Sequence, residues 1–312
     1  MTGFTTGTDY LTRSNVWSGQ LKMVLEDELQ ATKYIRMLTD FPDGDTINMP
    51  SLGQATVDDY VEDQSVKYRA MDTGNFTFTI SEYISSATYI TDKQKQDAFY
   101  MNELIAAFVP KQARAIMTHF ETTVMGLSAS QTASNTNTIN GASHRFIGTG
   151  TNETITVADF AKAKHALKVA NVPMTDLVAI VDPSVEYTLG TLPNISNLSM
   201  NPKWEGIVSS GIATGMKFVC NIHGFDVYTS NYLATANETI TLTTAAGKAN
   251  MFFSAAQDVL PFVGAWRQPA RVEPERNKDY QRDEYVTTAR YGAKLFRPEN
   301  LVCVLADTDQ IA

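Results

Sequence analysis

Histidine side chains are the first candidates for chemistry in this chain, because imidazole is a common general base and metal ligand near neutral pH. The chain has four of them, His119, His144, His165 and His223. None has a second histidine or a cysteine at the spacing of a zinc site. His119 and His165 fall on expected helices, where we expect surface or packing roles. The histidines therefore predict neither a metal centre nor a catalytic base.

Carboxylates are the second group that could do chemistry. Asp43-Gly44-Asp45 and Asp58-Asp59 bring oxygen ligands together, but the full calcium-loop pattern is missing. The chain also lacks the Gly-x-Ser-x-Gly, phosphate-loop and dinucleotide-binding motifs. A hydrolase with two catalytic carboxylates stays open, since acidic residues flank the expected helices, although nothing singles out one pair. We expect no catalytic residue, no cofactor and no metal ion.

A run of mixed charge near the end of the chain is its most informative feature. From Arg267 to Glu284 the positive and negative residues are equal in number and interleave, so the segment has no net charge. Such a segment neither repels its own copies nor attracts a polyanion. It predicts a surface that pairs with another copy of the same chain, with a solvated surface element as the alternative.

Length and composition limit the class of protein. The 312 residues allow one large domain or two, and the hydrophobic fraction of 43% is ordinary for a globular protein. A net charge of −9 without a basic stripe argues against a dedicated nucleic-acid binder, but not against a protein that encloses nucleic acid. Cys220 and Cys303 lie among apolar neighbours, which predicts buried free thiols and a reducing compartment. No secretion signal or membrane-spanning apolar run is evident.

The first third of the chain predicts a polar arm, a helix and an extended β segment. Residues 1–13 form the arm, and an amphipathic helix begins at Ser14 and fades before Pro42. Residues 46–92 are poor in apolar side chains and predict a long two-stranded excursion, in which Phe76–Ile80 is a half-buried strand. Such a hairpin is marginal alone and needs a partner surface.

The remainder predicts a long helix followed by an α+β module. The helix covers 93–125, and Pro110 should kink it or end its first half. Asn140-Gly141 predicts a hairpin turn, and Thr156–Asp159 predicts a capping box at the start of another helix. Further helices and strands alternate up to residue 265. We expect the long helix and the terminal strands to share one core, which the chain leaves for 155–265 and then re-enters.

Two local patterns, in this order of elements, carry a resemblance to a known family. One is Gly224–Asn231, a turn and strand, and the other joins Glu275-Arg276 to the ending Tyr291–Glu299, which contains Tyr-Gly-Ala-Lys and Arg-Pro-Glu. The chain resembles tailed-bacteriophage major capsid proteins, whose fold is shared with encapsulin shells and the floor domain of herpesvirus capsids. The resemblance covers most of the chain and implies an α+β fold in five parts. These are an N-terminal arm at 1–45, an extended loop at 46–92, a peripheral domain with a spine helix at 93–154, an axial domain at 155–265, and a return to the peripheral domain at 266–312.

The resemblance also implies a structural role rather than an enzymatic one. Copies would form hexamers and pentamers and close into an icosahedral virion shell around double-stranded DNA, without sequence-specific DNA binding and without a membrane. A separate scaffolding protein, a portal and possibly a cement protein would take part, in the cytoplasm of a bacterial host. Lys67 is the only lysine in 46–92 and has no identifiable partners, so we expect no covalent cross-link. We expect inter-subunit ion pairs from Arg271, Glu273, Glu275, Arg276 and Arg282.

Three other functions stay open at this stage. An encapsulin-like compartment would have the same fold and a protein cargo. A receptor-binding or adhesion module would fit the Thr- and Asn-rich β segments, although no repeat is visible. A hydrolase is the third, because α+β domains host many enzymes.

Overall fold

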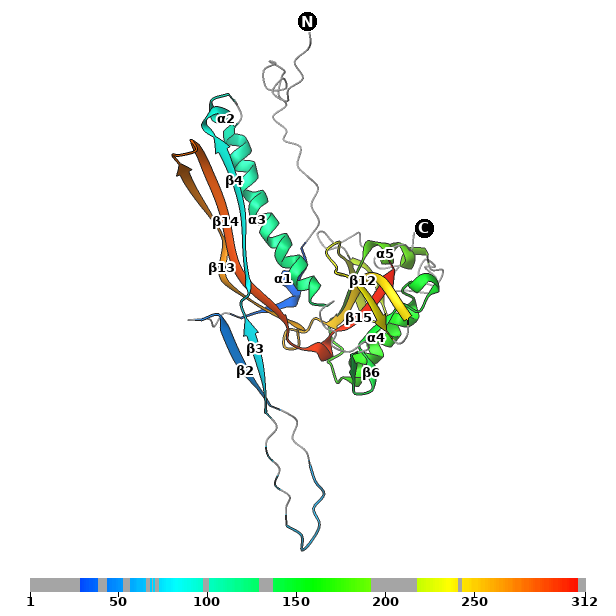
Figure 1. Cartoon of the computed structure of the whole chain (residues 1–312). Coiled ribbons are helices and arrows are strands. Elements are labelled where there is room, and N and C mark those ends of the chain that lie inside the picture. The colour runs from blue at the N-terminus through cyan, green and yellow to red at the C-terminus, as the bar shows by residue number, and fades with distance from the viewer. Residues whose placement is uncertain are drawn as a thin grey trace.

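Two large β-sheets with their helices, and two small two-stranded sheets, make up the described part of the chain. The computed structural model describes residues 29–38, 44–52, 57–65, 68, 70, 73–97, 101–128, 137–191, 218–240 and 243–307. One sheet has four strands in the order β1-β13-β14-β4, and the other has seven, β7-β15-β12-β8-β10-β9 with β11 beside β12. We call the four-stranded sheet with α2 and α3 the blade, and the seven-stranded sheet with α4 and α5 the lobe (Figure 1). The expected α+β class is confirmed.

The strand bounds are as follows. The blade contains β1 (Ile35–Met37), β4 (Glu82–Thr91), β13 (Phe262–Asn277) and β14 (Arg282–Leu295). The lobe contains β7 (Arg145–Ile147), β8 (Leu177–Val181), β9 (Phe218–Ile222), β10 (Phe225–Thr229), β11 (Thr235–Ile240), β12 (Thr243–Ser254) and β15 (Val302–Asp307). Short 3-10 helices cover Thr151–Glu153 and Pro298–Asn300.

The long helix of the blade is α3 (Met101–Gly126), which follows the short α2 (Asp92–Asp97) and confirms the helix expected over 93–125. It lies along one face of the sheet (Figure 1). Gln112 of α3 accepts a hydrogen bond from the Thr287 hydroxyl at 3.1 Å, and the Phe120 ring packs on Tyr291. The helix continues through Pro110, so the alternative that Pro110 ends a first half is wrong. A proline inside a helix removes one backbone donor, and packing against the sheet offsets that loss.

A two-stranded excursion projects from the blade, formed by β2 (Thr46–Leu52) and β3 (Thr73–Thr79) in antiparallel register. Phe78 is buried at its base with Ile80 and Val263, which confirms the half-buried strand expected there. The excursion is shorter than the expected 46–92, because β4 pairs along its length with β14 instead. Ten residues of ladder hydrogen bonds favour that pairing over an isolated hairpin.

The lobe has a core on each face of its sheet. All five residues of β8 are buried, and α4 (Val157–Val169) and α5 (Pro183–Thr191) pack on one face. Residues from the C-terminal half of α3 cover the other face, together with Tyr291 and Leu301. The long helix and the terminal strands share a core as expected, but residues of 155–265 such as Ile180 and Phe253 belong to the same core. Asp159 closes the expected capping box by accepting the Thr156 backbone N–H at 2.8 Å. Asn140 and Gly141 take positive φ angles between β5 (Thr138–Ile139) and β6 (Ala142–Ser143), which confirms the hairpin turn.

Two terminal segments differ from expectation. β15 was expected with the returning peripheral part at 266–312, but it pairs with β12 and β7 in the lobe, because its apolar side chains are buried there. The helix expected from Ser14 falls mostly outside the described residues. Where described, α1 is the four-residue turn Ala31–Tyr34, and the chain then becomes β1. Ile35 is buried against Gly264, where a Cβ would come within 2.6 Å of the Ile35 Cδ1, so pairing with β13 overrides the helical pattern.

Both cysteines were expected to be buried free thiols, and the structure describes the side chain of one of them. Cys303 is a free thiol buried in the lobe, as expected, and burial raises its pKa to about 11. The side chain of Cys220 lies outside the described residues.

Candidate functional site

The face of the blade that points away from α3 is a candidate functional surface. Cross-strand partners in a sheet share a face, so the register defines it. Tyr83 lies opposite Arg290, Ser85 opposite Thr288, and Thr288 opposite Arg271. Alternate residues of β4 are exposed, with Tyr83 at 66% and Tyr89 at 56%. We call this surface the outer face; its members are Tyr83, Ser85, Ala87 and Tyr89 of β4, Arg282, Glu284, Val286, Thr288 and Arg290 of β14, and Arg271, Glu273 and Glu275 of β13.

Four of the five residues expected at a subunit interface lie on the outer face. Arg271 Nε is 3.4 Å from Glu273 Oε1, and both side chains are mostly exposed. Arg282 donates from Nε to Glu284 Oε1 at 2.6 Å. Its guanidinium also lies 4.5 Å from the ring centroid of Tyr89. The register thus gathers side chains that the sequence shows only as a mixed run.

Glu275 is the member of this group whose charge is least compensated. It lies opposite Glu284 in the register, and like charges directly opposite each other are unfavourable. Arg282 first, and then Asn277, bind the Glu284 carboxylate and hold its pKa below its ordinary value. Within the described residues the structure gives Glu275 no ion pair or side-chain hydrogen bond.

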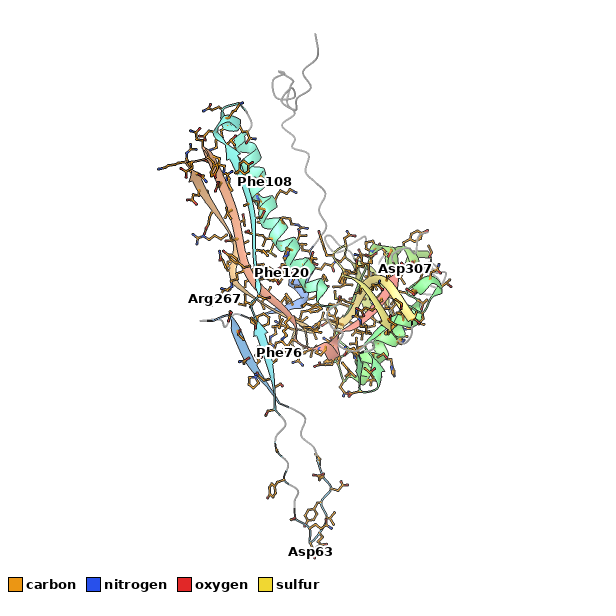
Figure 2. The ribbon with its side chains drawn as sticks, in the orientation of Figure 1. Asp63, Phe76, Phe108, Phe120, Arg267 and Asp307 are labelled. Carbon is orange, nitrogen blue, oxygen red and sulfur yellow. The ribbon has the colours of Figure 1, made fainter. Side chains whose placement is uncertain are left out.

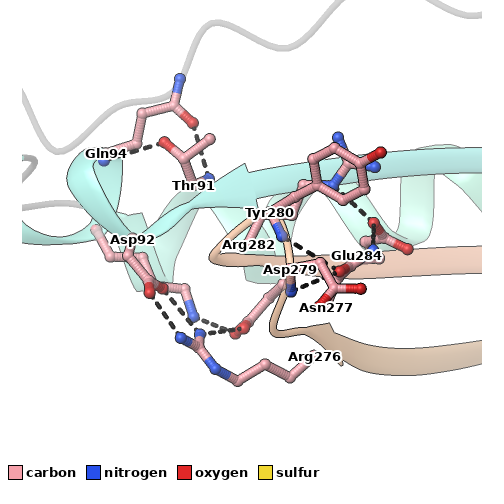
Figure 3. Close-up of polar contacts among 11 residues, drawn as sticks. Thr91, Asp92, Gln94, Arg276, Asn277, Asp279, Tyr280, Arg282 and Glu284 are labelled. Atoms are coloured by element: carbon pink, nitrogen blue, oxygen red, sulfur yellow. Dashed lines mark hydrogen bonds and ion pairs between the residues drawn. The ribbon is translucent and has the colours of Figure 1, made fainter.

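Arg276, the fifth expected residue, faces the other way. Its two terminal nitrogens donate to Asp92 at 2.8 and 2.6 Å, and one also donates to Asp283 at 3.1 Å (Figure 3). Lys95 also forms an ion pair with Asp283. The hydrogen bond from Arg276 holds the pKa of Asp92 below its ordinary value, and Lys95 followed by Arg276 lowers the pKa of Asp283. We call these four residues the tip cluster, since they fasten the β13–β14 turn to α2.

Charge on the outer face is uneven along its length. Arg271 and Arg290 lie on the half nearer the middle of the molecule, whereas three carboxylates (Glu273, Glu275 and Glu284) and one cation (Arg282) lie toward the β13–β14 turn. The half toward the turn therefore carries net negative charge, although both signs are present there.

A buried ion pair in the lobe was missed by sequence reasoning. Arg145 is fully buried; it donates from Nε to Glu238 at 2.7 Å and from Nη1 to the Ser128 carbonyl at 2.7 Å. It thereby joins the end of α3 to β7 and β11. The partners are 93 residues apart in the chain, so no local pattern indicates the pair.

A second buried contact fastens the N-terminal segment to the blade and the lobe. Glu121 of α3 accepts the backbone N–H of Gln30 at 3.0 Å and of Ala31 at 2.7 Å. Burial raises the pKa of Glu121. The Gln30 side chain donates to the Thr229 carbonyl of the lobe at 2.8 Å. This contact positions the point at which the preceding chain leaves the described structure.

Within the described part of the chain, no group of three His, Cys, Asp or Glu residues could hold a metal ion. His119 Nδ1 lies 2.7 Å from the Tyr291 hydroxyl as part of the packing between α3 and β14. His144 is buried, and its burial lowers its pKa. Within the same residues, no helix is long and apolar enough to cross a membrane.

A family model of a phage capsid protein matches residues 75–304, which include the blade strands β4, β13 and β14, the helix α3 and nearly all of the lobe. The chain belongs to this phage capsid protein family. Solved structures agree in fold. A chain from Mycobacterium phage Che8 superposes with a TM-score of 0.70 and 15% identity, over 97% of this chain and 98% of that chain. A capsid chain of cyanophage P-SCSP1u gives 0.71 and 17% identity, over 98% and 96%.

A third structure, the capsid asymmetric unit of cyanophage Pam1, gives a TM-score of 0.69 and 14% identity over 98% of this chain and 99% of that chain. No curated protein matches the sequence. The chain is thus a phage major capsid protein with the phage capsid fold, and its role is structural: it forms a capsid shell from repeated subunits. The resemblance stated from the sequence is confirmed.

Proposed function

We propose that copies of this phage capsid protein form hexamers and pentamers, which close into an icosahedral shell around the double-stranded DNA genome of a tailed phage. The observation that carries the proposal is the unpartnered outer face of the blade beside a projecting excursion. A monomer leaves Tyr83 and Tyr89 exposed on the outer face, together with apolar side chains on the excursion. Repeated subunits can cover such surfaces mutually, and heterologous contacts of this kind close into rings.

In this proposal the blade is the peripheral domain and the lobe is the axial domain. The lobes would gather around the axis of each ring, and α3 would be the rigid spine of the peripheral domain. The excursion between β2 and β3 would lie over a neighbouring subunit. The residues preceding Gln30 would form the N-terminal arm, with its exit fixed by Glu121.

Residues of the outer face would make the inter-subunit ion pairs. Arg271, Glu273, Glu275 and Arg282 lie there, and Glu275 in particular needs a cation from another copy. Arg276 would make its inter-subunit contact at the edge of this interface. Half of its side chain is exposed, even though it binds Asp92 and Asp283 of its own chain. Many modest contacts, repeated around a shell, would together give its stability.

Further partners are part of the same proposal. A separate scaffolding protein would guide assembly, a portal would occupy one vertex, and a cement protein is a further candidate. The DNA would be enclosed without sequence-specific contacts, because the net charge of −9 gives no basic groove. Assembly would take place in the cytoplasm of the bacterial host, and the subunit would have no enzymatic activity.

Expression of the chain, alone and with candidate scaffolding proteins, tests the proposal. We expect rings of five and six subunits or closed shells in negative-stain electron microscopy, with matching masses by light scattering. A chain that stays monomeric under all these conditions would contradict the proposal. Shells of Glu275→Ala are expected to dissociate at lower salt or temperature than parent shells, and equal resistance would remove Glu275 from the interface.

A further inference from the structure

The exposed side of α4 is a basic patch on a chain whose net charge is −9. Lys162, His165 and Lys168 follow one another at three-residue spacing, which places them on one side of the helix, and Lys164 lies at the edge of that side. The opposite side of α4 is buried in the core of the lobe. We call these four residues the α4 patch; the helix that carries it covers the face of the lobe sheet opposite to α3 (Figure 1).

The lysines of the α4 patch have no carboxylate partner. In the described part of the chain, none of the ion pairs includes a lysine of this patch. Asp159 is the only carboxylate on α4, and it is fully buried and accepts the hydrogen bonds of the capping box. Four other carboxylates gather at 57–65, but Asp63 of this group lies at the far end of the excursion, well away from Asp307 of the lobe (Figure 2). The positive charge of the patch is therefore available to an anion from outside the chain.

Two lysines of the patch are held in place by neutral groups. The Lys162 ammonium lies 4.0 Å from the ring centroid of Phe146, and the Lys164 ammonium donates to the His223 carbonyl at 2.7 Å. An ammonium group has three donors, so both lysines keep donors for an anion. A side chain that is already positioned loses less entropy when it binds, which favours binding by this patch over binding by unrestrained surface lysines.

The side-chain chemistry of the patch favours a phosphate backbone over a protein partner. Protein interfaces are usually anchored by aromatic or large apolar side chains. None of the exposed large apolar side chains in the described residues lies on α4. Lysine binds phosphate as a point charge and needs no apolar anchor. From Lys162 to Lys168 the helix rises about 9 Å, which is long enough to meet successive phosphates of one DNA strand.

We propose that the α4 patch faces the interior of the shell and binds the phosphate backbone of the enclosed double-stranded DNA. The three lysines would contact phosphates, and His165 would donate a further hydrogen bond to a phosphate oxygen. Such contacts carry no base information, and they let DNA slide, so the duplex could still enter and leave the shell. The inference rests on the proposed enclosure of DNA and adds to it the surface of the subunit that meets the DNA.

Charge neutralisation in the full-length chain tests the patch. The patch variant changes its three lysines to glutamine (Lys162→Gln with Lys164→Gln and Lys168→Gln). The matched control removes the same charge from three exposed lysines of the blade (Lys93→Gln with Lys278→Gln and Lys294→Gln). Lys294 is a close match, because it also donates to a backbone carbonyl and lies near an aromatic ring. Binding of mixed-sequence double-stranded DNA fragments to the unassembled chain is measured by fluorescence anisotropy at about 50 to 200 mM salt, with circular dichroism as the folding check.

We expect the patch variant to bind DNA about tenfold or more weakly than the parent at the lowest salt. The slope of log affinity against log salt should become shallower by about 0.9 for each phosphate contact that is lost. The control should stay within about threefold of the parent, because its lysines lie outside the contact. A control that loses as much affinity as the patch variant would overturn the inference, and so would a parent chain without measurable affinity for DNA at low salt.

Lysine acetylation of assembled shells tests which side of the shell the patch faces. Shells with and without enclosed DNA are treated with acetic anhydride, and mass spectrometry measures the modification of each lysine. The patch lysines should be acetylated several-fold more slowly in DNA-filled shells than in empty ones, whereas the control lysines should react alike in both. Equal acetylation of the patch in both would place it away from the DNA, open to an acidic protein, and would overturn the inference while leaving shell formation intact. A parent chain that forms no shell would contradict the proposed function, whereas the anisotropy measurement would still support or overturn DNA binding by the patch.

Discussion

The lobe and the blade use their strands in opposite ways. Every residue of β8 and the first five residues of β15 are buried, and rings from α4, β10 and β12 pack edge to face between the lobe sheet and α4. In β13 of the blade, by contrast, only the first four residues are buried, and most of the rest are exposed. The lobe sheet is covered on both faces within one chain, by α4 and α5 on one side and by α3 on the other. The blade sheet has α3 on one face only, and its outer face is open in the single chain.

The charged side chains of the lobe and the blade also differ in burial. In the lobe the fully buried Arg145 has three hydrogen bonds, because an uncompensated charge there would be very costly. On the outer face of the blade the charged side chains are exposed or half-buried, and one of them, Glu275, has no cation within the described residues. The lobe thus pairs its charge inside the fold, whereas the blade keeps charged side chains open to solvent on the face where we propose that other copies bind. Three predictions test this difference in the monomer.

The largest effect is expected in the aromatic core of the lobe. Phe252 is fully buried, with ring centroids of Phe160 and Phe225 at 5.0 and 5.5 Å. Phe252→Ala should lower the free energy of unfolding by about 3–5 kcal/mol through lost burial and the remaining cavity. Chemical denaturation followed by circular dichroism measures it.

The matched change in the blade is Tyr83→Ala, which removes an exposed ring. It should alter the free energy of unfolding of the monomer by no more than about 0.5 kcal/mol. Equal losses for the two variants would mean that the blade is as self-sufficient as the lobe, and the comparison would fail.

A second, smaller loss is expected from the buried ion pair. Arg145→Met leaves the Glu238 carboxylate without its cation, and it also leaves the Ser128 carbonyl without a donor. Because Glu238 is itself 22% exposed and can recover some hydration, the loss should lie near the lower end for a broken buried pair, about 3 kcal/mol. Thermal and urea unfolding measure it.

The double variant Arg145→Met with Glu238→Leu serves as the control for this pair. It should be more stable than Arg145→Met alone, because replacing both charges removes the unpaired carboxylate. If the double variant loses the sum of two independent single losses, the pair is not coupled in the way that the structure indicates.

Local patterns in the sequence predicted those elements whose geometry is itself local. The Asn140-Gly141 turn, the capping box at Thr156–Asp159 and the α3 helix need only neighbouring residues, and they are confirmed. The prediction of a helix at residues 35–37 was wrong for the opposite reason. These residues fit a helical pattern, but Gly264, more than two hundred positions later, has no Cβ and lets Ile35 pack against β13. Tertiary pairing overrides weak local preference.

The candidate site shows the same limit. The charged run at 267–284 is visible in the sequence, but which side chains share a face depends on the register of β13 with β14 and of β14 with β4. That register places Arg276 opposite to the other four residues. Alternation within β13 separates Arg276 from Arg271, Glu273 and Glu275, but it does not show which residues of β14 and β4 lie beside them.

The smallest effect is expected at the tip cluster, where Arg276 holds Asp92 and Asp283 on the exposed end of the blade. Because the charges are solvated, Arg276→Ala should leave the melting temperature of the monomer nearly unchanged at neutral pH while it speeds amide hydrogen exchange in α2 and in the β13–β14 turn. The carboxylate pKa values are lowered in the folded chain, so their contribution is present above the ordinary values of 3.8 and is lost as the pH falls below them. The difference in exchange between parent and variant should therefore be full near neutral pH, shrink below about pH 4, and fall in high salt.

Arg271→Ala is the control for this prediction. Its contact with Glu273 fastens no second element, so its exchange pattern should match that of the parent. A difference that persists unchanged at acid pH would show that Arg276 acts through packing rather than through its ion pairs.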